Sequence, residues 1–150
     1  MQSISKKQHI KNEMKKRVLW MIALLCASPF GGWGAGAWAQ TSVSTAQQLS
    51  YAITDGANIR LTADILLSSY LNINGMAVTI DLNGHRLYRN LNSSASDGHI
   101  FWVHANGNVG GHLTIDDSST AKSGTIEGGN ATNGGGINVW PGCSLTVNWL

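Results

Sequence analysis

Cysteine is scarce in this chain of 150 residues, which contains only Cys26 and Cys143. Cys26 lies in an N-terminal segment that we expect to be removed, so the remaining protein has one cysteine and cannot form an internal disulfide. An exported protein would be permitted disulfides by its compartment. Its stability must therefore come from burial and strand pairing.

Basic residues are also scarce once the N-terminal segment is set aside. Residues 1–39 contain six of the ten Lys and Arg and one acid, whereas residues 40–150 contain four basic residues and seven acids. The later part is mildly acidic and has no Lys or Arg cluster that could follow a phosphate backbone. Nucleic acid is therefore excluded as an expected partner.

No apolar run is long enough to span a membrane. Lys15-Lys16-Arg17 precedes the apolar run 18–27, which is short of the ~20 residues that a membrane-spanning helix needs. A stretch of small residues then ends in Ala37-Trp38-Ala39. This order predicts a secretory signal peptide over residues 1–39, cleaved between Ala39 and Gln40.

Two details of the signal allow alternatives. Translation that started at Met14 would still give a complete signal. Cys26 raises the question of lipidation, but Leu25 precedes it where lipidation signals have a small residue. We therefore expect no lipid anchor and no transmembrane span in the mature chain.

Apolar spacing divides the mature chain in two. Residues 40–56 predict a short helix, with a capping box of Ser44 and Gln47 and an apolar face that includes Leu49 and Ile53. From residue 57 to 150 the period changes to two, which predicts half-buried strands. Their apolar positions are Ile59/Leu61, Leu71/Ile73, Val78/Ile80/Leu82, Leu113/Ile115, Ile137/Val139 and Leu145/Val147/Trp149.

Three of these strands resemble one another. Val78–Asp81, Leu113–Asp116 and Leu145–Asn148 begin 35 and 32 residues apart, and each follows another strand and a Gly-containing turn. A unit that recurs at this interval is typical of a stacked array, in which each coil buries its face against its neighbours. The alternative is an antiparallel sandwich, which short strands and turns also build.

The order of the segments helps to choose between them. A helix is followed by segments 59–65, 78–87, 124–130, 134–139 and 144–148, which include Val-Thr-Ile-Asp-Leu-Asn-Gly-His-Arg-Leu and Gly-Gly-Gly-Ile-Asn-Val. This order resembles the N-terminal part of the right-handed parallel β-helix proteins of the pectin-lyase-like superfamily, in particular their large, secreted, adhesin-like bacterial members. The resemblance implies an all-β solenoid in which a short helix over residues 40–56 caps coils over residues 57–150.

The last strand pattern carries no protecting charge or proline. Leu145, Val147 and Trp149 continue the pattern to the final residues. Natural solenoids protect their terminal repeats. We therefore expect the coils to continue beyond residue 150 in a longer protein, the alternative being a partner that covers the last coil.

Two polar clusters are candidate binding sites. Alternation places Asp81, Asn83 and His85 on one outward face, with Arg86 beside them as a cation. Asp116 and Asp117 form the second cluster, which could supply Ca²⁺ ligands or an acid and a base. For each we also weigh an ordinary explanation, a turn for the first and a solvated strand end for the second.

The sequence lacks the residue patterns of metal-binding and phosphate-binding sites. The later histidines show no metal-ligand spacing, and the Gly-rich segments 107–111 and 128–136 lack the Gly-Lys-Ser/Thr of a phosphate cradle. We predict no metal and no cofactor. The aromatic residues could stack on sugar rings, although some must be core; they are Tyr88, Phe101, Trp102, Trp140 and Trp149.

These patterns predict a secreted or surface-exposed bacterial β-helix that is a non-catalytic scaffold or adhesin-like binding protein. Its expected partner is a surface polysaccharide or a glycan on a host or neighbouring cell. One alternative is the N-terminal part of a polysaccharide lyase or glycoside hydrolase whose catalytic residues lie beyond residue 150, because fold alone does not license a reaction. The other is a truncated product without function.

Overall fold

The helix predicted over residues 40–56 is shorter in the structure. The computed structural model describes residues 39–148, so the predicted signal peptide, apart from Ala39, lies outside the described residues, as does Trp149. Within 40–56 the chain forms strand β1 (Thr41–Val43) and then helix α2 (Ala46–Ala52). The predicted helix over 40–56 is therefore too long at both ends.

The N-cap also differs from the prediction. Thr45 is the N-cap, and its side chain accepts a hydrogen bond from the backbone N–H of Gln48. The side chain of Gln48 in turn accepts from the backbone N–H of Ser44. The capping hydrogen bond thus joins Thr45 and Gln48, one residue later than the predicted Ser44 and Gln47, and residues 41–43 before it are held extended by pairing with β2.

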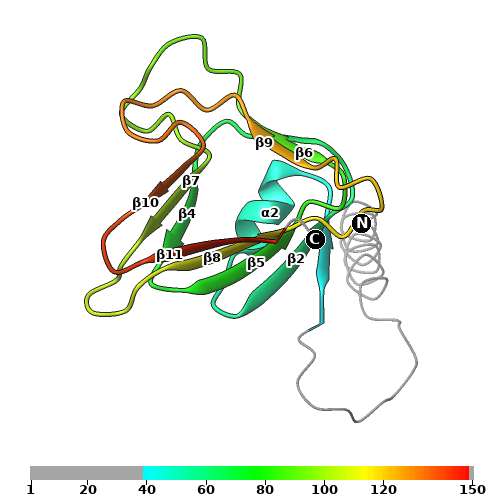
Figure 1. The fold of residues 1–150 in the computed structure, drawn as a ribbon, viewed down its shortest axis with the longest axis horizontal. Helices are drawn as coiled ribbons and strands as arrows, with labels where there is room; N and C mark the ends of the chain where they lie inside the picture. The colour runs from blue at the N-terminus through cyan, green and yellow to red at the C-terminus, as the bar shows by residue number, and fades with distance from the viewer. Residues whose placement is uncertain (1–38, 149–150) are drawn as a thin grey trace, which may run out of the picture. The chain divides into compact units, whose positions relative to one another are not determined.

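The other regular elements of the described chain are strands, which form three sheets (Figure 1). The five-stranded sheet has the order β1-β2-β5-β8-β11, and the two three-stranded sheets have the orders β10-β7-β4 and β3-β6-β9. The strands after β1 are β2 (Ala57–Leu61), β3 (Ile65–Leu66), β4 (Leu71–Asn74), β5 (Ala77–Asp81), β6 (Arg86–Tyr88), β7 (Phe101–His104), β8 (His112–Asp116), β9 (Thr125–Glu127), β10 (Ile137–Val139) and β11 (Ser144–Asn148).

Every pairing between these strands is parallel, and the pairing follows the repeat seen in the sequence. Val78 on β5 is opposite Leu113 on β8, which is opposite Leu145 on β11. The prediction that the three similar strands stack is therefore confirmed. The antiparallel sandwich is wrong, since its sheets would be built from antiparallel neighbours.

Alternation along the strands supplies the apolar core that the three sheets enclose (Figure 1). Ile59, Ile80 and Ile115 occupy successive strands of the five-stranded sheet and are almost completely buried. Leu49 of α2 joins the same cluster with no exposed surface. Val147 on β11 is in register with Ile115 but 41% exposed, because β11 is the edge strand of this sheet among the described residues.

The turn after β5 explains why one predicted alternation fails. Asn83 and Gly84 have positive φ angles of 49° and 80°, as their residue types favour. The strand has ended at Asp81, and the next strand, β6, starts at Arg86. Period-two geometry therefore does not extend from Asp81 to His85, and these side chains need not share a face.

Candidate functional site

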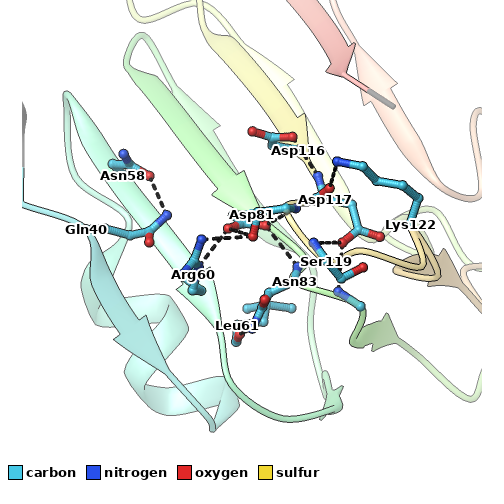
Figure 2. Close-up of polar contacts among 12 residues, drawn as sticks. Gln40, Asn58, Arg60, Leu61, Asp81, Asn83, Asp116, Asp117, Ser119 and Lys122 are labelled. Atoms are coloured by element: carbon cyan, nitrogen blue, oxygen red, sulfur yellow. Dashed lines mark hydrogen bonds and ion pairs between the residues drawn. The ribbon is translucent and has the colours of Figure 1, made fainter. Parts of the chain in front are cut away.

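The first predicted cluster centres on Asp81, which the structure places in a closed network (Figure 2). Its carboxylate accepts hydrogen bonds from Arg60 Nε at 2.8 Å and from Ser118 Oγ at 2.7 Å. The backbone N–H groups of Ser118 and Asn83 also donate to it. Arg60 and Asp81 are opposite each other on paired strands, on the face away from the core residue Ile80.

Asp81 is 3% exposed, so the prediction that it lies on an open surface is wrong. Burial opposes its ionisation, but the hydrogen bonds from Ser118, Arg60 and Asn83 outweigh that effect and lower its pKa. The carboxylate is therefore charged and fully engaged. It joins β2, the turn after β5 and the turn after β8, and has little capacity left for a ligand.

Asp117, from the second predicted cluster, is buried completely. One carboxylate oxygen accepts from the backbone N–H groups of Gly84 and Ser119, and the other accepts from Gly124 at 2.7 Å. Burial again opposes ionisation, and hydrogen bonds from these three residues overcome it, so the pKa is lowered. The predicted solvated strand end is thus wrong for Asp117, which holds two turns together.

Asp116 does not join Asp117 in a site. It is the last residue of β8 and partly exposed, and its carboxylate accepts from the backbone N–H of Asp117. Because the two carboxylates have separate partners, they do not converge as a pair of ligands or as an acid and a base. Among residues 39–148, no three His, Cys, Asp or Glu side chains gather as a metal-binding group.

His85 and Arg86 belong to a different network. Arg86 Nε is 3.1 Å from Asp64 Oδ2, and its NH1 is 2.9 Å from Glu127 Oε1. His85 Nδ1 is 3.5 Å from Asp64 Oδ1. The hydrogen bonds of the Arg86 backbone and side chain lower the pKa of Asp64. The predicted cluster of Asp81, Asn83, His85 and Arg86 is therefore divided between two networks, with Asp81 and Asn83 in one and His85 and Arg86 in the other.

A hollow lined by aromatic rings lies elsewhere, on the outward face of β4, β7 and β10. It is a cavity of about 250 Å³ lined by three aromatic rings, one carboxylate and several neutral polar groups. The lining residues are Tyr70, Ser96, Asp97, His99, Trp102, Asn133, Asn138 and Trp140. We call this cavity the aromatic pocket.

Strand register explains how the aromatic pocket forms. Phe101 and Val103 of β7 are buried in the core, so Trp102 and His104 face outward. Trp102 is opposite Asn72 on β4 and Asn138 on β10. Each strand thus places one residue of the outward row at the same level.

Two loops complete the rim of the aromatic pocket. The loop before β7 provides Ser96 and Asp97, and the Gly-rich segment 128–136 provides Asn133. The loops run beside each other in Figure 1 and are joined by backbone hydrogen bonds, including Asn130 N–H to the carbonyl of Gly98. A Cβ at Gly98 would collide with the carbonyl of Asn130, so glycine is required there for close approach.

The rings of the aromatic pocket are in mutual contact. Trp102 stacks on His104 with centroids 4.4 Å apart. Tyr70 and Trp140 each stand edge-on to Trp102, both at 5.6 Å. Edge-on and offset arrangements are the favoured geometries for such rings. One outermost ring, Trp140, is 51% exposed, so the pocket offers aromatic surface to a ligand.

His99 distinguishes the aromatic pocket from the acidic networks. It is 4% exposed, and neither of its ring nitrogens has a hydrogen-bond partner. Burial and the nearby positive charge of Arg89 lower its pKa, so the ring is neutral near pH 7. Buried polar groups are usually paired, so an unpaired imidazole beside a cavity indicates a place where a ligand or water completes the bonding.

Trp102 and Trp140 were predicted from the sequence as residues that could stack on sugars, but Tyr70, His99 and Asn138 were not. The register of the paired strands is the signal that could have placed Asn138 beside Trp102. Once Ile73, Val103 and Val139 are aligned as equivalent core-side positions, Trp102 and Asn138 fall at one outward level. Tyr88, the other platform considered outside the core, contacts Arg86 instead, with the guanidinium carbon 4.6 Å from its ring centroid.

No helix within residues 39–148 has the length and apolar character needed to cross a bilayer. The chain matches no protein-family model, no curated protein and no solved structure.

Proposed function

We propose that residues 40–150 form a right-handed parallel β-helix that is exported behind the signal peptide 1–39 and binds glycans at a cell surface without catalysing a reaction. Support for the solenoid comes from three parallel sheets whose strands recur in register along the chain. Support for the cap comes from α2, which contributes Leu49 to the first part of the core.

The observation that carries the binding function is the aromatic pocket. Sugar rings present apolar C–H faces and polar hydroxyl edges, so they suit a site with aromatic surface and a few convergent polar groups. Trp140 and Trp102 supply the aromatic surface. Asn138, Asn133 and Asp97 supply the polar groups. The cavity of about 250 Å³ is of a size to take one or two sugar units of a longer chain.

The distribution of carboxylates favours binding over hydrolysis. Glycoside hydrolases commonly use two carboxyl groups across the scissile bond. The aromatic pocket is lined by one, Asp97. Asp81 and Asp117 are committed to buried hydrogen bonds, and Asp64 and Glu127 are paired with Arg86.

The test is a binding measurement with the purified protein and a panel of soluble oligosaccharides, by calorimetry. Trp140→Ala should weaken binding roughly tenfold or more, as loss of a central aromatic contact does in other interfaces. Tyr51→Ala is the matched control, because Tyr51 is an exposed aromatic residue on α2 that does not line the pocket. Equal binding by the wild type and Trp140→Ala would reject the proposed function.

Export is tested separately. The full chain, expressed in a bacterial host, should appear outside the cytoplasm with Gln40 as its first residue by mass spectrometry. Substitution of Ala37 and Ala39 by bulky residues should leave the precursor uncleaved. An intact N-terminus on the exported wild type would contradict the signal peptide.

A further inference from the structure

The aromatic pocket has an unusual balance of charge, which bears on the class of sugar it takes. This step rests on the proposed glycan-binding function. Asp97 is the one ionised side chain among the residues that line it, and it is exposed at the rim. The other polar groups of the lining come from Ser96, Asn133 and Asn138, which are neutral.

The nearest cation is turned away from the aromatic pocket. Arg89 is 4% exposed, and its guanidinium donates hydrogen bonds to the backbone carbonyls of Asp97 and His99. Arg89 does not line the cavity. Its hydrogen bonds fix the loop that carries Asp97, so its guanidinium is not placed to pair with the carboxylate of a ligand, although its charge acts on His99.

His99 adds no charge either. A neutral imidazole has one N–H donor and one acceptor nitrogen. Both ring nitrogens lack a partner within the protein, although the residue is 96% buried. The two nitrogens point away from each other and have almost no accessible surface, so His99 contributes a neutral ring to the lining and no charged group.

We infer that the aromatic pocket takes pyranose units that carry no carboxylate, such as hexoses and N-acetylhexosamines, and discriminates against uronates. A hexuronate would place its carboxylate near Asp97 with no Lys or Arg in the lining to offset the repulsion. Like-charge contact of this kind is a usual source of discrimination between similar ligands. An uncharged sugar meets aromatic surface, neutral amides and one acceptor carboxylate without that cost.

The experiment titrates the purified protein with three sets of oligosaccharides of equal length: uncharged, uronic and amino sugars. We expect uncharged chains to bind roughly tenfold more tightly than uronic chains at low salt. Asp97→Asn should raise the ratio of uronate affinity to uncharged-chain affinity several-fold, because it removes the charge and keeps a polar side chain at the rim. Added salt should reduce the discrimination in the wild type, because Asp97 is solvent-exposed.

The outcomes separate this inference from the proposed function. Trp140-dependent binding of uronates as tight as that of uncharged sugars would overturn the selectivity and leave glycan binding intact. Weaker binding of protonated amino sugars than of uronic chains would also overturn it, since the carboxylate of Asp97 repels an anion and attracts a cation. Absence of Trp140-dependent binding in all three sets would overturn the proposed function and the selectivity together.

Discussion

The buried carboxylates of Asp81 and Asp117 are fully hydrogen-bonded, whereas the buried imidazole in the aromatic pocket has no hydrogen-bond partner. Asp117 lies beneath the surface with three backbone donors on its carboxylate, and Asp81 has four hydrogen bonds. The ring of His99 is just as buried, and neither of its nitrogens has a hydrogen bond. Satisfied groups hold strands and turns in place, whereas an unsatisfied group beside a cavity marks a place where the bonding is incomplete.

This contrast also shows why acidic residues were a poor guide to the site. A carboxylate near a strand end is equally useful for binding a ligand and for accepting backbone N–H groups. In the sequence the two uses look alike. Here the backbone N–H groups of Gly84, Ser119 and Gly124 donate to the carboxylate of Asp117, and the candidate site lies among aromatic residues instead.

The largest effect should follow from breaking the Asp117 network. Asp117→Ala leaves three N–H groups without an acceptor, one of them buried and two partly buried, and we expect a loss of about 3 kcal/mol in the free energy of unfolding. Asp117→Asn should also destabilise, because its amide NH₂ would face the N–H of Gly124 or the other two donors. Urea denaturation measures both.

Asp97→Asn is the control for that comparison. Asp97 is an exposed carboxylate at the pocket rim, so its loss should change stability by less than about 0.5 kcal/mol. If Asp117→Ala were no more destabilising than Asp97→Asn, the structural role assigned to Asp117 would be wrong.

A smaller and more gradual effect is expected from acid. The pKa values of Asp81 and Asp117 are lower in the folded protein than the value of about 4 expected in the unfolded chain. Their contribution to stability is therefore fully present above about pH 4 and is lost as the pH falls through the folded values. Denaturation midpoints measured from pH 6 to pH 2 should show this fall, and Asp81→Asn should make it shallower.

The smallest effect should come from His99. Its pKa is lowered by burial and by Arg89, so the unfolded chain binds a proton more readily than the folded protein. Stability should therefore be complete above the unfolded pKa of about 6.5 and decrease as the pH falls toward the folded value. His99→Phe should remove this dependence, and the same change at the exposed His112 should not. An unchanged pH profile in His99→Phe would contradict the assignment of a buried neutral ring.

Repeats made much of the fold predictable. The similarity of the strands that begin at Val78, Leu113 and Leu145 is sufficient to align β5, β8 and β11, because parallel strands in a stack place like residues at like positions. Turn chemistry located the bend at Asn83 and Gly84. These features depend on local sequence and on one repeat interval.

The site was less predictable because its members meet only after folding. Tyr70, Trp102 and Trp140 come from three separate segments, and their contacts depend on the register of three strands. The burial of Asp81 depends on Ser118, which is 37 residues away in the sequence. Neither local alternation nor composition contains that information.

The most direct test of the contrast measures binding and stability in two variants side by side. Trp140→Ala should lose roughly tenfold or more in affinity for an uncharged oligosaccharide and keep the wild-type melting temperature. Arg60→Met, which removes one partner of Asp81, should lower the melting temperature by several degrees and keep the affinity. The reverse pattern, with binding lost in Arg60→Met and retained in Trp140→Ala, would contradict the assignment of the site to the aromatic pocket.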